Sequence, residues 1–202
     1  MQIIQGRVHD PGAARATLDR WLTDLKPGAT GWLGGTYGVA ANGTLVACVR
    51  FTDKAAAMAN SARPEQASWW KDMETHFDGP VTFHDCDDVT LLLGGGSDDA
   101  RFVQVIQGRV TDRARFVELM DRSGDLLSHY RPDVLGATIA IDADGVVTET
   151  VAFTSEQAAR EAEHRTMPED ARALVDEEMS LLKDVVYLDL ESPWFASAQL
   201  RR

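Results

Sequence analysis

The chain has 202 residues, of which 44% are hydrophobic and 26% are charged, a composition ordinary for a globular protein of one large or two small domains. Its formal net charge of −12 at neutral pH argues against nucleic acids and anionic membrane surfaces as partners, because both repel an acidic protein. With no basic region before an apolar run, no apolar stretch near the ~20 residues that span a bilayer, and only two cysteines, we expect a cytoplasmic protein.

The first part of the chain predicts a strand, a helix and a hairpin. Residues 3–8 favour a strand, and Asp10 then provides a cap for a helix. The apolar residues of that helix recur at helical spacing, at Leu18, Trp21, Leu22 and Leu25. Two further strands, Trp32–Val39 and Thr44–Phe51, flank Asn42 and Gly43, a pair that favours a type I′ hairpin turn.

The rest of the first half predicts a second helix and a last strand. Asp53 is placed to cap a short helical segment, and Pro64 opens the main second helix. The apolar positions assigned to this helix are Trp69, Trp70, Met73 and Phe77. A strand at residues 81–86 completes the order β-α-β-β-α-β.

An internal repeat sets the organisation of the whole chain. Residues 2–10 read QIIQGRVHD and residues 104–112 read QVIQGRVTD, so that seven of nine positions are identical. Asp144 and Gly145 stand where Asn42 and Gly43 stand in the first copy. We therefore expect a first repeat at residues 1–88, a glycine-rich linker at 89–100, a second repeat at 101–191 and a tail at 192–202.

A βαββαβ unit duplicated in one chain resembles the dimeric α+β barrel superfamily, and within it the antibiotic-biosynthesis-monooxygenase-like (ABM-like) proteins. The resemblance implies an α+β fold in which two ferredoxin-like repeats pack sheet to sheet, as an intramolecular pseudo-dimer. It leaves a further homodimer open. Proteins of this shape include cofactor-independent oxygenases of aromatic substrates, haem-degrading enzymes and isomerases, so the fold alone does not choose the function.

The two repeats differ in their aromatic residues. Trp69 aligns with Ala173, and Trp32 aligns with Val134. Tyr37 aligns with an isoleucine. One interpretation is that the first repeat encloses a pocket for a flat ligand, while the second has become a scaffold. The other is that these rings fill a larger core.

The first strand carries polar residues on one face, because Gln5 and Arg7 are two positions apart. If the strand is central in its sheet, the arginine must be paired or must line a cavity. Its repetition as Arg109 favours an ion pair, and recognition of an anion or a carbonyl group is the alternative.

Several other patterns point away from a site. His84, Asp85 and Cys86 alternate faces in a strand and cannot converge on one ion, so we expect no metal. Cys48 and Cys86 are predicted on strands that the first strand separates, too far apart for a disulfide. The acidic runs at residues 161–163 and 176–178 are interpreted as solvated helix faces.

The resemblance also suggests site residues. Haem degradation in this superfamily uses a Trp and a His near the second helix and an Asn in the first strand. Trp69 and His76 are the candidates here, but their spacing is shorter than that pattern and Gln5 replaces the Asn. Both departures argue against haem, and we expect no cofactor.

Quinone-forming oxygenases of the superfamily use an Asn and a Trp near the second helix and a later Arg. Asn60 and Trp69 can fill the first two roles, but no arginine occurs between residues 71 and 100. The third role is left to Arg7 or Arg50.

The functional hypothesis is a cofactor-independent monooxygenase that acts on a small phenol- or quinol-like molecule in the first repeat. In it Trp69 stacks on the ring, Asn60 or Gln5 orients a hydroxyl group, Arg7 stabilises the phenolate and His76 accepts the proton. The other residues assigned to the substrate are Trp32, Tyr37 and Arg50. The rival hypothesis is a non-catalytic protein that binds a small molecule or a partner on the same scaffold.

Overall fold

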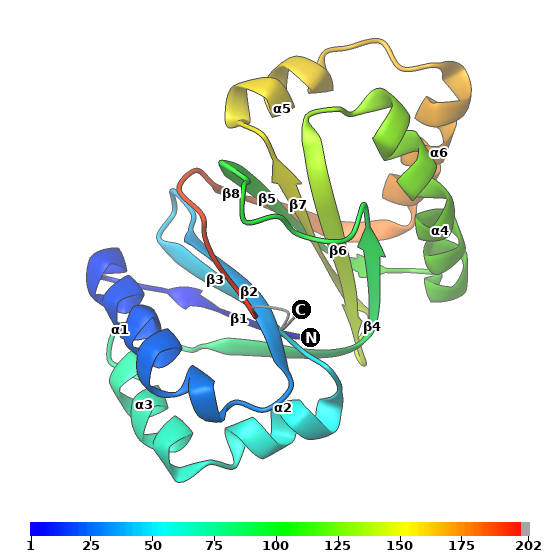
Figure 1. The fold of residues 1–202 in the computed structure, drawn as a ribbon. Helices are drawn as coiled ribbons and strands as arrows, with labels where there is room; N and C mark the ends of the chain where they lie inside the picture. Colours follow the sequence, from blue (N-terminus) through cyan, green and yellow to red (C-terminus); the bar gives the residue numbers. More distant parts are fainter. Residues whose placement is uncertain (199–202) are drawn as a thin grey trace. The chain divides into compact units, whose positions relative to one another are not determined.

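The structure is a computed structural model that describes residues 1–198 (Figure 1). These residues form two compact units: unit 1 comprises Met1–Asp85 together with the strand Trp194–Ser197, and unit 2 comprises Cys86–Pro193. The end of the predicted tail, at residues 199–202, lies outside the described part of the chain. Within residues 1–198, no helix combines the length and the apolar character needed to cross a membrane.

Unit 1 contains an antiparallel sheet and helices that pack on it. In chain order its elements are β1 (Gln2–Arg7), α1 (Pro11–Asp24), the 3-10 helix η1 (Lys26–Gly28), β2 (Trp32–Val39), β3 (Thr44–Phe51), α2 (Lys54–Ser61), α3 (Pro64–Glu74), the first part of β4 (Thr82–Leu92) and β9 (Trp194–Ser197). The hydrogen-bonded strand order is β4-β1-β3-β2-β9. The first repeat therefore has the predicted β-α-β-β-α-β order, with β1 and β3 in the middle of its sheet.

Side-chain caps explain where the helices of unit 1 begin. The Asp10 carboxylate accepts a hydrogen bond from the backbone N–H of Ala13 at 2.9 Å, and Asp53 accepts one from Ala56 at 2.8 Å. Each bond satisfies one of the first-turn N–H groups that have no partner within the helix. Pro64 occupies the first position of α3, where a missing N–H has no consequence.

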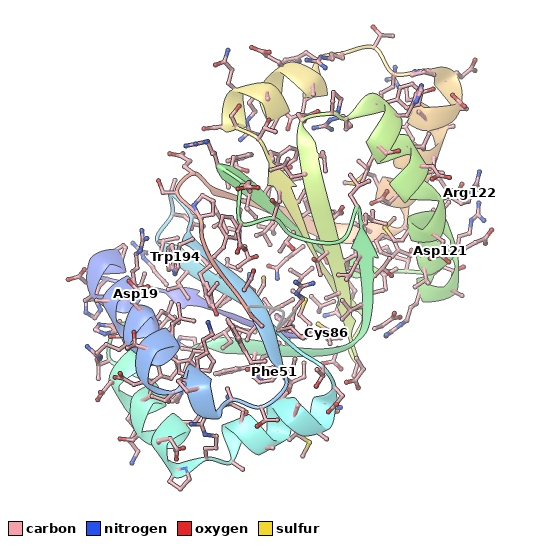
Figure 2. All side chains as sticks on the ribbon, in the orientation of Figure 1. Asp19, Phe51, Cys86, Asp121, Arg122 and Trp194 are labelled. Carbon is pink, nitrogen blue, oxygen red and sulfur yellow. The ribbon has the colours of Figure 1, made fainter. Side chains whose placement is uncertain are left out.

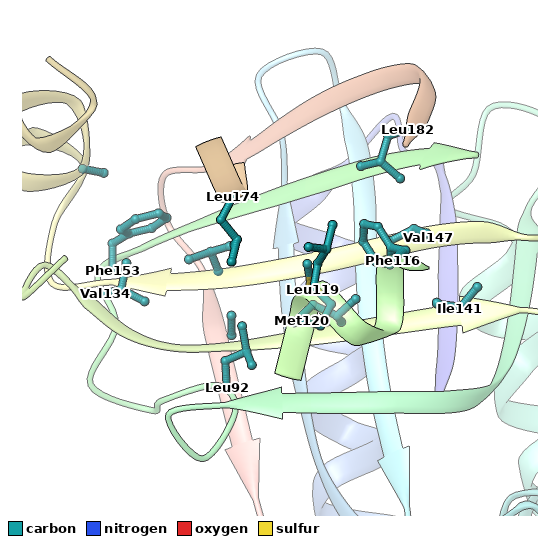
Figure 3. Close-up of a cluster of buried hydrophobic side chains, with 14 of the residues drawn as sticks. Leu92, Phe116, Leu119, Met120, Val134, Ile141, Val147, Phe153, Leu174 and Leu182 are labelled. Atoms are coloured by element: carbon teal, nitrogen blue, oxygen red, sulfur yellow. The ribbon is translucent and has the colours of Figure 1, made fainter. Parts of the chain in front are cut away.

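Unit 2 repeats this arrangement. Its elements are the second part of β4, then β5 (Phe102–Val110), α4 (Arg113–Tyr130), β6 (Val134–Asp142), β7 (Val146–Phe153), α5 (Glu156–Glu163), α6 (Glu169–Ser180) and β8 (Leu182–Leu190). The strand order is β8-β5-β7-β6-β4. Its core lies between α4, α6 and the sheet, and Phe116, Leu119 and Leu174 are among the side chains buried there (Figure 3). The prediction of an α+β fold with two ferredoxin-like repeats is confirmed.

The boundaries between the repeats differ from the prediction. β4 does not stop near residue 86 but continues to Leu92, through residues expected to begin the linker. Its first part pairs with β1, where Gln2 faces Asp85, and its second part pairs with β6, where Leu92 faces Ala137. The predicted tail likewise supplies β9, which pairs with β2. Open strand edges carry unpaired N–H and C=O groups, and these two segments satisfy them.

The hairpin turns also differ from the prediction of type I′ geometry. The N–H of Gly43 donates to the carbonyl of Ala40 at 2.8 Å, so the turn is centred on Ala41 and Asn42. Gly43 then follows with φ of +83°, while Asn42 is not among the residues with positive φ. The Asn42 side chain accepts from the N–H of Thr44 at 2.9 Å, which holds the turn from within.

Helix α3 is shorter than the apolar pattern predicted. It ends at Glu74 with Thr75 as its C-cap, so His76 and Phe77 belong to the connection that follows. Trp69 and His76 therefore do not share a helical stripe. Phe77 instead packs across Gly6 of β1, where a Cβ would lie 2.5 Å from the ring.

Candidate functional site

One face of the unit 1 sheet, under α1 and α3, gathers large aromatic side chains. We call Trp21, Trp32, Tyr37, Trp69 and Trp194 the aromatic cluster. The Trp21 ring lies 5.8 Å from that of Trp32 and 6.4 Å from that of Trp69. Tyr37 stacks on Trp194 at 6.2 Å with an angle of 18° between the rings. The cluster contains residues from β2, α1, α3 and β9.

Two indoles of the cluster are anchored by hydrogen bonds within the protein. Nε1 of Trp21 donates to Oε1 of Gln66 at 2.6 Å, and Nε1 of Trp69 donates to the carbonyl of Thr17 at 2.9 Å. Both bonds join α1 to α3. Trp69, predicted to stack on a substrate, therefore uses its N–H to hold these two helices together.

The other two indoles are buried donors without an acceptor. Within residues 1–198, no hydrogen-bond partner reaches Nε1 of Trp32 or Nε1 of Trp194, and both atoms are shielded from solvent. Trp32 is only 6% exposed. A buried donor that has lost water without gaining an acceptor costs about 1–3 kcal/mol, so native structures seldom keep one without a reason.

Cations lie against both of these indoles. Nζ of Lys26 is 4.9 Å from the centre of the Trp32 ring, and the guanidinium carbon of Arg15 is 5.1 Å from that of Trp194. Trp194 is labelled in Figure 2. Each pair has the geometry of a cation–π contact. The surroundings of these two donors thus carry positive charge, which would favour an electron-rich or anionic oxygen as their acceptor.

Tyr37 is a neutral, deeply buried member of the cluster. Burial raises the pKa of its hydroxyl well above the usual value, with a smaller contribution from Cys48. The side chain folds over Gly35, where any Cβ would collide with the Tyr37 ring and hydroxyl. Tyr37 therefore remains a phenol and does not act as an anionic base near neutral pH.

His76 and Trp69 meet at one residue of α1, although they do not share a helix face. Nε2 of His76 lies 2.9 Å from Oγ1 of Thr17, whose carbonyl accepts the Trp69 bond. The His76 backbone carbonyl also accepts from the N–H of His9 at 3.1 Å. The structure thus brings these two predicted residues together at Thr17, which is 1% exposed and which the sequence did not single out.

The predicted arginine and glutamine residues lie elsewhere. Ile4 of β1 and Val8, which directly follows the strand, pack in the core under the helices, so Gln5 and Arg7, which alternate with them, lie on the opposite face of the sheet. Arg50 occupies the opposite face of β3 for the same reason, because Val49 packs in the helix-covered core. Arg7 is exposed rather than buried. The structure does not bring Gln5, Arg7 or Arg50 together with Trp69 and His76.

Asn60 is buried, but its side chain belongs to a structural network. Its Oδ1 accepts from Nη1 of Arg63 at 2.9 Å, and the same nitrogen donates to the carbonyl of Leu25 at 3.0 Å. Arg63 also pairs with Glu65 at 2.9 Å. This network ties α2 and α3 to the end of α1, which accounts for the burial of Asn60.

Unit 2 holds a pair of acidic residues that the sequence reading missed. Glu149 of β7 and Glu178 of α6 both face the unit 2 interior, so the prediction that residues 176–178 form a solvated helix face is wrong for Glu178. Burial raises the pKa of Glu149 to about 7, and burial together with the charge of Glu149 raises that of Glu178 to about 8. The position of Glu149 between Val147 and Val151, both buried, was the available signal.

No group of His, Cys, Asp and Glu in residues 1–198 is arranged to hold a metal ion. Cys48 and Cys86 are both buried, and they are not joined by a disulfide. The predicted strand order β4-β1-β3-β2, on which the absence of a disulfide rested, is the order observed.

Two ferredoxin-like repeats in one chain give an α+β fold, and solved structures share that fold over nearly the whole chain. A protein from Lactobacillus acidophilus named "putative monooxygenase" has a TM-score of 0.73 at 12% identity, over 96% of this chain and 94% of that one. One of the same name from Fusobacterium nucleatum has a TM-score of 0.73 at 8% identity, over 97% and 93%. An "anthrone oxidase-like protein" has 0.69 at 12% identity, over 100% and 94%. The sequence matches no protein-family profile and no curated protein.

Proposed function

We propose that the chain binds a small aromatic molecule against the aromatic cluster of unit 1 and oxidises it as a cofactor-independent monooxygenase. The fold supports the reaction class, because it is shared over nearly the whole chain with proteins named as monooxygenases. The aromatic cluster supports the ligand class, because its rings offer flat apolar surfaces to an aromatic ligand.

The observation that carries the proposal is the contrast between the four indoles. Trp21 and Trp69 donate to protein acceptors, whereas Trp32 and Trp194 keep buried N–H groups without one. An indole N–H donates and cannot accept. A ligand that meets these two donors would do so through hydrogen-bond acceptors, such as the oxygen of an aromatic ketone or of a phenolate.

The reaction proposed needs no external electron donor. Oxidation of anthrone by O₂ replaces a CH₂ group with C=O, so that one oxygen atom enters the ring and the other leaves as water. The first step is loss of a proton from the substrate, which leaves a negatively charged oxygen. Lys26 and the N–H of Trp32 would stabilise that charge, and His76, held at Thr17 beside Trp69, is the proposed proton acceptor.

The test combines binding and turnover with one probe. Anthrone should quench the tryptophan fluorescence of the protein at saturable concentrations, whereas anthracene, which has the same ring skeleton without an oxygen acceptor, should bind at least tenfold more weakly. An oxygen electrode and the absorbance of anthraquinone then measure turnover. One O₂ consumed per anthraquinone, in excess of the rate without protein, supports the monooxygenase.

Three variants locate the site. Trp32→Phe removes a free donor and should weaken anthrone binding about tenfold, in line with the ~1.5 kcal/mol of one hydrogen bond. Trp21→Phe removes a donor that already has an acceptor and should leave binding within twofold. Arg7→Gln, on the opposite face of the sheet, should also leave it unchanged. An equal loss of anthrone affinity in all three variants would contradict a binding site at Trp32.

A second candidate function is binding without catalysis. It is favoured by the separation of the predicted catalytic residues, since Arg7 and His76 lie on different sides of the sheet. Saturable anthrone binding that depends on Trp32, with no oxygen uptake above the control, would select this function.

A further inference from the structure

Unit 2 contains two carboxyl groups in the interior between its sheet and α6. Glu149 stands in the middle of β7, on the side of Val147 and Val151, which are 1% and 8% exposed. Its neighbours across the sheet are Ile139 of β6 and Ile106 of β5. A carboxylate in this position is surrounded by aliphatic side chains, which cannot replace the hydrogen bonds of water.

Glu178 approaches the same region from the helix layer. It lies one turn after Leu174, a buried residue of the unit 2 core, and beside Met179, which packs against that core. The charge of Glu149 acts on Glu178, so the two side chains are close enough to interact. We call Glu149 and Glu178 the acid pair.

Among the described residues, no hydrogen bond or ion pair to a cation reaches either member of the acid pair. On α4, Arg115 binds Glu118 and Glu177, and the exposed Arg122 acts on Glu177. Arg160 of α5 pairs with Glu156, Glu163 and Asp189, and Arg109 of β5 donates a hydrogen bond to the backbone carbonyl of Asp144. Lys183, Asp184, Arg172 and Asp176 are exposed.

Glu149 and Glu178 are each half-buried, and two unpaired carboxylates placed so close together resist ionising at the same time, because each disfavours the charge of the other and both have lost part of their hydration. Protonation removes this conflict, since a protonated carboxyl group can donate a hydrogen bond to its neighbour. The first repeat has no such feature, because Ala47 occupies the place of Glu149 and the residue equivalent to Glu178 is the exposed Glu74.

We propose that the acid pair is a proton-dependent clamp, which holds the C-terminal half of α6 on the unit 2 sheet when protonated and releases it when both carboxyl groups ionise. In the released state both groups return to water and to ordinary acidity, so release gives up protons. The clamp therefore makes its full contribution to holding α6 on the sheet below pH 4.5. This contribution decreases as the pH rises and is lost above about pH 8. Between these limits each proton released raises the opening constant of α6 about tenfold per pH unit.

The experiment measures protonation and opening on the intact chain. Carboxyl ¹³C NMR of glutamate-labelled protein should show two groups that titrate between pH 6 and 9. Hydrogen exchange of the α6 amides, corrected for the intrinsic effect of pH, should show an opening constant at least tenfold larger at pH 8 than at pH 6. The backbone amides of α3 in unit 1 serve as an internal reference, and their opening constant should not rise between pH 6 and pH 8.

Variants make the test specific. The double variant Glu149→Gln with Glu178→Gln should remove both titrations and the pH dependence of α6 opening. Glu149→Ala, which introduces the residue of the first repeat, should reduce the pH dependence of the α6 opening constant to half of the wild-type value or less. Glu177→Gln on the same helix is the control and should keep the slope of the wild type. Ordinary carboxyl titrations near pH 4.5, or an unchanged slope in the double variant, would overturn the proposal.

Discussion

The unequal bonding of Trp21 and Trp32 predicts unequal effects of one substitution on stability. Both indoles are 6% exposed, so Trp→Phe removes nearly the same apolar area at each position and this part of the change in unfolding free energy cancels. What differs is the N–H group. Trp21→Phe loses the hydrogen bond to Gln66, which contributes about 0.5–1.5 kcal/mol.

Trp32→Phe removes a buried donor that has no acceptor, which relieves a desolvation penalty of about 1–3 kcal/mol. It also weakens the contact with Lys26, which contributes about 0.5–1 kcal/mol at a partly exposed site. In the absence of ligand, we therefore expect Trp32→Phe to be more stable than Trp21→Phe by about 1–3 kcal/mol.

Urea unfolding followed by circular dichroism measures the difference in unfolding free energy between the two variants. The comparison requires that the unfolding free energy of both depends equally on urea concentration. At this chain length the corresponding difference in Tm is about 2–12 °C. If Trp32→Phe is destabilised as much as Trp21→Phe, its N–H has an acceptor in solution, and both the free donor and the binding site built on it would be refuted.

Three further substitutions test packing and pairing by thermal or urea unfolding. Gly6→Ala places a Cβ 2.5 Å from the Phe77 ring and should destabilise unit 1 by about 1–3 kcal/mol; a neutral result would mean that the ring is not held there. Gly124→Ala, inside α4 with 3.8 Å of clearance, should instead stabilise unit 2 by about 1 kcal/mol, and a loss would contradict the helical packing. Arg131→Leu leaves the Asp133 carboxylate, whose side chain is 4% exposed, without its partner and should cost about 3 kcal/mol, which a surface ion pair would not.

The sequence was sufficient for the fold because several local signals agreed. The bounds of β2 and β3 were predicted to the residue, and the caps at Asp10 and Asp53 form the expected hydrogen bonds. These features depend on neighbours in the chain and on strand periodicity, which a sequence displays directly. The hairpin type was missed because Asn42 and Gly43 were read as the central pair, whereas the carbonyl of Ala40 shifts the turn by one residue.

The candidate site was harder to predict because it depends on which side of the sheet a residue faces. Arg7 was grouped with Trp69 by chemical type, and strand alternation under the helices places it on the other face. The size of Trp69 predicts a role in stacking on a ligand, yet its N–H donates to the carbonyl of Thr17, a residue without an evident motif. Glu178 was hidden in an acidic run, because a helical wheel alone does not reveal that a carboxylate on β7 lies opposite.

Unit 1 is discontinuous along the chain, since its outermost strand β9 follows all of unit 2. On the ribosome, the outer edge of β2 consequently waits for its neighbour while the 154 residues between Val39 and Trp194 are added, roughly 8–30 s of synthesis. Trp194 belongs to the same strand, so the ring that stacks on Tyr37 is also synthesised after unit 2. The aromatic cluster therefore cannot form fully until β9 has been made, and a nascent chain halted before β9 presents an unpaired edge to which another copy can donate its own strand.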